Sequence, residues 1–93
     1  MVALIATITA KADKIDELKK ELLNLVKHTT QELGCIKYIL HQEIENPHVF
    51  RFYEQFKDQA AFEFHGNQPY IKAMADKAHL REGNSVLTFL ELV

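Results

Sequence analysis

The sequence predicts an α+β domain with the element order β-α-β-β-α-β, the ferredoxin-like arrangement with an antiparallel sheet. Four segments show the period of two that is typical of strands, and two stretches between them repeat apolar residues at helical spacing. The chain has 93 residues, of which 47% are hydrophobic, enough for one globular core but not for two. We therefore expect residues 1–93 to fold as a single domain.

The first strand and first helix come from residues 2–33. Alternate residues of 2–9 are apolar or β-prone on both sides, which predicts a central strand with both faces covered. Asp13 and Asp16 resemble a capping box, and apolar residues then recur at helical spacing as far as Leu33. Gly34 is expected to end this helix in the left-handed conformation.

A hairpin follows the first helix. Residues 35–45 alternate again, and residues 45–48 carry the Asn-Pro signature of a turn. Residues 49–56 form the next alternating segment, so the two strands should pair in antiparallel fashion. The strand over residues 49–56 carries one carboxylate, Glu54, in a row with three phenylalanines on the same face.

The second helical region begins with Asp58 as its expected N-cap and carries His65 just before Gly66, which should stop the helix. A second helical piece is expected to begin with Pro69 in its first turn, capped by Asn67, and to reach about residue 79. The chain then turns into a last strand over residues 85–93.

The predicted sheet has apolar residues on both faces, but helices for only one of them. A second copy of the chain is the simplest cover for the other face, so we expect a homodimer. At this length a monomer's core would be modest, which favours the same conclusion.

Composition excludes several classes of partner. A formal charge of −2 with scattered lysines gives no basic surface for nucleic acid. The single cysteine, Cys35, fits a reducing compartment. The apolar start over residues 2–10 is too short for a membrane span and lacks a basic leader. We expect a cytoplasmic protein that binds neither nucleic acid nor membrane.

His65 and Glu54 are the candidate catalytic residues. An imidazole titrates near neutral pH and can move a proton to or from a phenol or a hydroperoxide. A carboxyl among aromatic rings should have a raised pKa if it is buried. The alternatives are that His65 only caps a helix end and that Glu54 makes a structural hydrogen bond or ion pair.

We expect the substrate pocket to be lined by aromatic and apolar side chains near these two residues; the alternative is ordinary core packing, which is the more common role of phenylalanine and methionine at such positions. They are Phe52, Phe56, Tyr38, Tyr70 and Met74. For a phosphorylated ligand, the basic candidates near the pocket are Lys37, Arg51 and Lys72. No spacing of residues indicates a metal site.

Several short motifs point in one direction. Glu32 is followed by Gly34, Cys35 and Tyr38, in the pattern E-x-G-C-x-x-Y, and the strand F-Y-E-Q-F is followed by Asp58, Ala61-Phe62, His65 and Pro69-Tyr70. These motifs resemble those of the antibiotic biosynthesis monooxygenase family, small enzymes that use no cofactor. The resemblance implies a dimeric α+β barrel and oxygenation of a small quinol or phenol, with proton transfer at His65.

Two positions differ from the family pattern. Phe56 stands where many quinol-oxidising members have tryptophan, and Tyr70 where several have histidine. A related branch degrades a phosphorylated carbonyl signal of the autoinducer-2 type. The segment from Phe52 to Lys72 resembles that branch at least as closely as it resembles the quinol-oxidising members. An isomerase of such a small carbonyl compound, or a non-catalytic dimeric module that binds a small ligand, are therefore the alternative functions.

Overall fold

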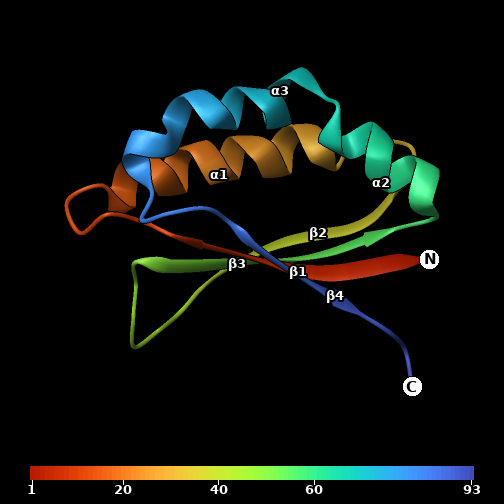
Figure 1. Ribbon diagram of the computed structural model, residues 1–93, viewed down its shortest axis with the longest axis horizontal. Coiled ribbons are helices and arrows are strands. Elements are labelled where there is room, and N and C mark those ends of the chain that lie inside the picture. Colours follow the sequence, from red (N-terminus) through yellow and green to blue (C-terminus); the bar gives the residue numbers. More distant parts are fainter.

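A computed structural model describes all of residues 1–93 and confirms the predicted α+β fold (Figure 1). The elements in chain order are β1 (Val2–Thr9), α1 (Ile15–Thr29), β2 (Cys35–Gln42), β3 (Val49–Phe56), α2 (Gln59–Gly66), α3 (Pro69–Lys72), the 3₁₀ helix η1 (Ala73–Leu80) and β4 (Val86–Leu90). The strands form one sheet in the order β2-β3-β1-β4, and every neighbouring pair is antiparallel. The central position predicted for β1 is correct.

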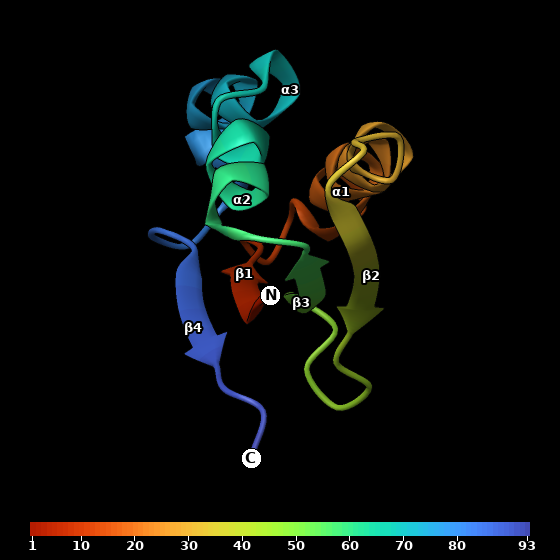
Figure 2. The same ribbon diagram turned by 90° about the vertical axis from the view of Figure 1, so that its right-hand side faces the viewer.

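All the helices lie on one face of the sheet, and Figure 2 shows that face covered and the other free. The alternating residues of β1 and β3 that point toward the helices are buried, because they pack against the apolar side of α1. This core contains Leu4, Ala6, Ile8, Leu18, Leu22, Leu25, Phe50, Phe52 and Phe56.

The helix-free face carries apolar side chains from all four strands. Ile5 of β1 lies between Tyr53 of β3 and Thr88 of β4. Ile39 of β2 and Leu90 of β4, toward the two edges, are 46% and 42% exposed. This face is therefore apolar without a cover in the single chain, as the sequence predicted.

None of the helices is long and apolar enough to span a membrane.

The first helix is shorter than predicted. It ends at Thr29 rather than near Leu33, and its N-cap is Lys14, with no side-chain cap from Asp13. Gly34 does not adopt a left-handed conformation, which occurs only at Gly83, with φ of +71°. Gly34 is instead a point of close approach, because an added Cβ would lie 2.3 Å from the Cβ of Ala61 in α2. The glycine lets the loop before β2 pass beneath α2.

The second strand also differs from the prediction. A β-bulge between Cys35 and Lys37 breaks the alternation, so Ile36 is 52% exposed instead of sharing a face with Tyr38. The bulge brings Tyr38 opposite Glu54 on the covered face. The strand ends at Gln42, before the predicted residue 45, and the side chain of Glu43 binds Asn46 of the hairpin loop and Arg51 of β3. β4 is likewise shorter than the predicted 85–93.

The helical region after β3 follows the prediction closely. Asp58 is the N-cap of α2, and its carboxylate accepts a hydrogen bond of 2.8 Å from the amide of Ala61. The break between α2 and α3 comes at Gln68, which is extended with ψ of 144° because Pro69 follows it. Gln68, not Asn67, is therefore the N-cap residue of α3. This break aims α3 and η1 back over the sheet.

Candidate active site

Glu54 lies in the middle of β3, on the face that the helices cover. It is opposite Leu4 of β1 and Tyr38 of β2, and only 4% of it is exposed. Burial raises the pKa of its carboxyl to about 8, and the negative charge of Glu32 contributes to the rise. Glu54 is therefore mostly protonated at neutral pH.

His65 lies in the last turn of α2, directly over Glu54. Its side chain is buried, with Nε2 3.9 Å from Oε1 of Glu54 and Nδ1 3.0 Å from Oε2 of Glu32. The ring also packs against Phe56 and Tyr38, with centroids 4.9 and 5.4 Å away. The imidazole is thus held on one edge by a carboxylate and presents its other edge to a second carboxyl.

Glu32 determines which nitrogen of His65 carries the proton. A carboxylate can only accept hydrogen bonds, so Nδ1 must be the donor in the 3.0 Å contact with Glu32. In the neutral ring, Nε2 then has a free lone pair, and it faces Glu54. In this tautomer Nε2 is the ring atom that can accept a proton, and Glu54 is the carboxyl that faces it.

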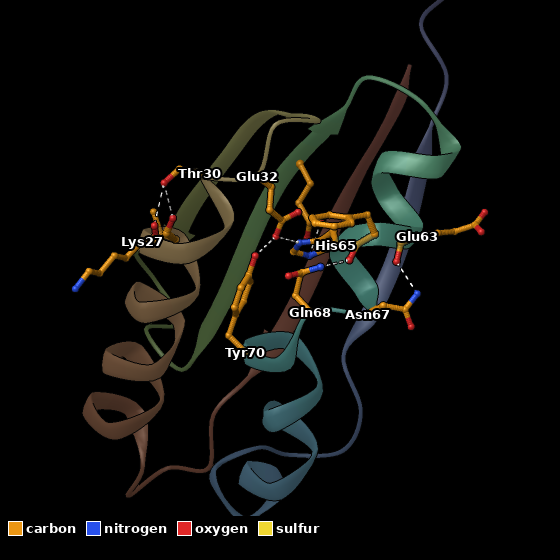
Figure 3. A network of polar contacts seen from close by, with 11 residues as sticks. Lys27, Thr30, Glu32, Glu63, His65, Asn67, Gln68 and Tyr70 are labelled. Atoms are coloured by element: carbon orange, nitrogen blue, oxygen red, sulfur yellow. Dashed lines mark hydrogen bonds and ion pairs between the residues drawn. The ribbon is translucent and has the colours of Figure 1, made fainter.

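Tyr70 of α3 completes the polar network. Its hydroxyl donates to the same Oε2 atom of Glu32, and Figure 3 shows Glu32 between Tyr70 and His65. Burial and this hydrogen bond raise the pKa of Tyr70 above its usual range. The ring of His28 stacks on Tyr70 with centroids 5.0 Å apart. Tyr70 therefore fixes the position of Glu32, and through it that of His65.

Glu54 and His65 lie on the wall of a cavity of about 500 Å³ between the sheet and the helices. Five of the predicted site residues line it together: Tyr38, Phe52, Glu54, His65 and Met74. Tyr38 stacks on Phe52 with centroids 4.4 Å apart. Burial, with a further contribution from Glu54, raises the pKa of Tyr38 above its usual range, so its hydroxyl remains a donor. The cavity combines an apolar wall with an acid, a base and a phenol.

The other two predicted pocket residues do not line this cavity. Phe56 is fully buried beneath His65, where it supports the imidazole ring. Tyr70 borders a separate pocket of about 640 Å³, which Glu32 also lines. Phe56 therefore contacts His65 from outside the cavity, whereas Tyr70 is linked to His65 only through Glu32.

The basic residues at the cavity are only partly those that the sequence suggested. Lys72 lines it, but Lys37 and Arg51 do not, and Arg51 pairs with Glu43 at 2.6 Å on the hairpin. Arg81, which the sequence did not single out, lines the cavity instead. No group of three or more potential metal ligands of the His, Cys, Asp and Glu types gathers anywhere in the chain.

A model of the family described as "Antibiotic biosynthesis monooxygenase" matches residues 1–77 of the chain. The chain belongs to this family. It is 31% identical over 77 residues to "Putative monooxygenase YcnE" of Bacillus subtilis, a match that covers 83% of this chain and 81% of the relative. Among solved structures, PA3566 of Pseudomonas aeruginosa is 34% identical to this chain with a TM-score of 0.93, and the match covers 99% of this chain and 93% of the other.

The likeness to a further crystal structure, of an antibiotic biosynthesis monooxygenase, supports the fold alone. The TM-score is again 0.93, at 24% identity, and the match covers 100% of this chain and 99% of the other. The antibiotic biosynthesis monooxygenase fold is therefore retained where few side chains agree.

Glu32 is the site residue that sequence reasoning did not assign. It stands at the first position of the E-x-G-C-x-x-Y motif through which the chain resembles the antibiotic biosynthesis monooxygenase family. Tyr38, the last position of that motif, lies in the same cavity as His65. The motif was thus the available signal for Glu32, because it links this acid to a residue of the cavity wall.

Proposed function

We propose that this protein is a cofactor-independent monooxygenase that acts on a small quinol or phenol with molecular oxygen. The single observation that supports it most is the pairing of His65 Nε2 with Glu54 at 3.9 Å on the wall of an apolar cavity. A ring nitrogen that faces a carboxyl of raised pKa is the expected pattern for proton-transfer chemistry.

In the proposed reaction, Nε2 of His65 removes a proton from a substrate hydroxyl. The resulting anion passes one electron to oxygen, and the radical pair combines to form a hydroperoxide on a ring carbon. Loss of the proton on that carbon and cleavage of the O–O bond then release water and leave a carbonyl. One quinol and one oxygen molecule therefore become one hydroxyquinone and one water, and the substrate supplies all the electrons.

Glu54 is proposed to supply the acid in this sequence. Because its pKa is raised to about 8, its carboxyl retains a proton at neutral pH that it can give to the peroxide oxygen. Tyr38 is proposed to donate a hydrogen bond to a substrate oxygen, since its phenol lies on the same wall. The apolar remainder of the cavity excludes water from the reactive anion.

The stoichiometry of oxygen uptake tests this function. With a naphthohydroquinone and no added metal or flavin, we expect the protein to consume one oxygen per quinol and to accumulate no hydrogen peroxide. Catalase should therefore return no oxygen. If catalase returns half of the oxygen consumed, the protein is only an oxidase of the quinol and the proposed oxygen insertion is wrong.

The second candidate is an isomerase or degrading enzyme for a small phosphorylated carbonyl compound. The observation that favours it is the presence of two cations, Lys72 and Arg81, at the cavity. The same base and acid could move a proton between two carbons of such a compound. Conversion of the compound without any oxygen uptake would support this candidate over oxygenation.

We also propose that two copies pair through their helix-free sheet faces. Replacing Ile5, at the centre of that face, by lysine should separate the dimer, because a charge would be buried against apolar side chains. The matched control is Ile44→Lys, since Ile44 is 96% exposed in the hairpin loop. Sedimentation of the parent protein as a 10.8 kDa monomer at micromolar concentration would contradict the proposal.

A further inference from the structure

Glu32 and Tyr70 act on the imidazole of His65 from outside the cavity. Both line the pocket of about 640 Å³, and neither lines the cavity of about 500 Å³ beside Glu54. The two pockets have no lining residue in common. The hydrogen bond from Nδ1 of His65 to Oε2 of Glu32 therefore links the cavity to a carboxylate that a substrate in the cavity does not touch.

The backbone around Glu32 is anchored on both sides. Its amide donates to the carbonyl of Thr29 at 3.0 Å, and its carbonyl accepts from the amide of Cys35 at 3.1 Å. The carbonyl of Gly34 accepts from the amide of Lys57 at 2.9 Å, which ties this loop to the connection between β3 and α2. The carboxylate is therefore presented to α2 by a fixed backbone.

The hydrogen bonds of the Glu32 carboxylate are concentrated on one oxygen. Oε2 accepts from both His65 and Tyr70, as Figure 3 shows, whereas Oε1 is buried without a partner. A buried acceptor that lacks a partner is unfavourable for stability. A carboxylate kept only for stability is not expected to leave one oxygen unsatisfied, so its effect on the imidazole is the better reason for its burial.

The contact with Glu32 disfavours the other tautomer of His65. With the proton on Nε2, the lone pair of Nδ1 would lie 3.0 Å from a carboxylate oxygen, and a hydrogen bond to a charged group would be lost. Such a hydrogen bond corresponds to a preference of about 10- to 100-fold. The carboxylate also stabilises the imidazolium that forms when Nε2 takes a proton, as the acid does in a Ser-His-Asp triad.

We propose that Glu32 and Tyr70 are positioning residues that make His65 an effective base. Glu32 keeps one proton on Nδ1 throughout, so that Nε2 can take the proton of the substrate hydroxyl. Tyr70 holds Glu32 in place through its hydroxyl, and the ring of His28 supports Tyr70 by stacking. The effect on the rate rests on the proposed function, but the effect on the tautomer does not.

Nitrogen-15 NMR of the neutral histidine rings tests the tautomer without turnover. The parent protein should carry the proton of His65 on Nδ1, and His65→Gln identifies the signals of this ring. Glu32→Leu removes the acceptor, so the ratio of the two tautomers should shift about 10-fold or more toward Nε2–H. A parent ring with its proton on Nε2, or a Glu32→Leu variant with the parent ratio, would overturn the inference.

Steady-state kinetics test the effect on the rate. Glu32→Leu should lower kcat about 10- to 100-fold and leave KM unchanged, because Glu32 lies outside the cavity. Glu32→Gln keeps a neutral acceptor and should lower kcat by less. Tyr70→Phe loses only the hydroxyl that holds Glu32, so its kcat should fall about 2- to 10-fold. The matched control, Glu63→Leu on the exposed side of α2, should keep the parent kcat.

The split between kcat and KM decides the role of Glu32. A higher KM at unchanged kcat in Glu32→Leu would mean that Glu32 binds the substrate, and would overturn the inference, as would the parent kcat in both Glu32 variants. The parent kcat in Tyr70→Phe would overturn the role of Tyr70. If Glu32→Leu does not fold, Glu32→Gln carries both measurements and should show a lower kcat and a weaker preference for Nδ1–H.

The two measurements separate this inference from the proposed function. A protein that turns over no quinol, but whose Nδ1–H tautomer is lost in Glu32→Leu, would retain the positioning role of Glu32 and reject the monooxygenase. Oxygenation of a quinol by a protein whose tautomer does not depend on Glu32 would do the reverse.

Discussion

Replacing His65 by glutamine should lower kcat about 100- to 10,000-fold, the range expected for loss of a general acid or base. Glutamine can still donate a hydrogen bond to Glu32, so the buried carboxylate that His65 contacts at 3.0 Å keeps a partner. It cannot accept and release a proton as imidazole does. The fold should therefore persist while the chemistry is lost. Steady-state kinetics and a thermal melt measure the two separately.

The matched control for this variant is His79→Gln, because His79 is exposed in η1 and lies outside the cavity. It should leave kcat unchanged. His65→Ala should resemble the glutamine variant in rate but melt at a lower temperature, since it leaves Glu32 buried without its histidine. If His65→Gln raises KM but keeps kcat, His65 only binds the substrate and is not the base.

The buried residues of β3 and the start of α2 could be predicted from the sequence, because both follow from patterns within a short segment. The alternation in β3 places Phe50, Phe52, Glu54 and Phe56 on one face, and the helices cover that face. Asp58 caps α2 through a contact within one turn. The approach of His65 to Glu54 follows from these two facts, because α2 begins immediately after β3.

The role of Glu32 could not be predicted from pattern, because it depends on an approach between distant segments. Glu32 and His65 are 33 residues apart, and a glutamate in a loop after a helix is usually solvated. It is buried here because Gly34 lets this loop pass close to Ala61 in α2. The bulge in β2 is a second such feature, since it shifts Cys35 and Tyr38 relative to a regular strand. Neither leaves a periodic signal.

The position of Tyr70 was also not predictable from its spacing. After the turn at Gln68 its hydroxyl donates to Glu32, and it lines the pocket of about 640 Å³ rather than the cavity beside His65. Phe56 has no opening to the cavity, so the absence of tryptophan there changes the support beneath His65 rather than the cavity wall.

Replacing Glu54 by glutamine should stabilise the protein at alkaline pH. The pKa of Glu54 is raised from its ordinary value of 4.5 to about 8 in the folded protein, so the folded state holds this proton more tightly than the unfolded state. Its contribution to stability is complete below pH 4.5 and is lost as the pH rises to 8. The loss is on the order of 1.4 kcal/mol per pH unit across that window. Glutamine cannot ionise, so the variant does not lose stability as the pH rises through this window.

The free energy of unfolding, measured at fixed protein concentration from pH 4 to pH 9, checks this expectation. The variant and parent should be similar in acid, and the variant should be more stable by a few kcal/mol above pH 8. Glu63→Gln, an exposed change in α2, should show no such divergence. A constant difference across the whole range would contradict a buried, protonated Glu54.

The same variant should lose activity, and the combination is what separates a functional acid from a structural one. A carboxyl retained only for stability would be replaced by glutamine at a loss, because a structural ion pair or hydrogen bond would be broken. A carboxyl retained for proton transfer is held at the expense of stability, since its desolvation at the cavity wall is unfavourable once it ionises. Glu54→Gln should therefore be more stable and less active than the parent at pH 8. Parent activity should decline above that pH as Glu54 loses its proton, and a variant that is both stable and fully active there would remove Glu54 from the mechanism.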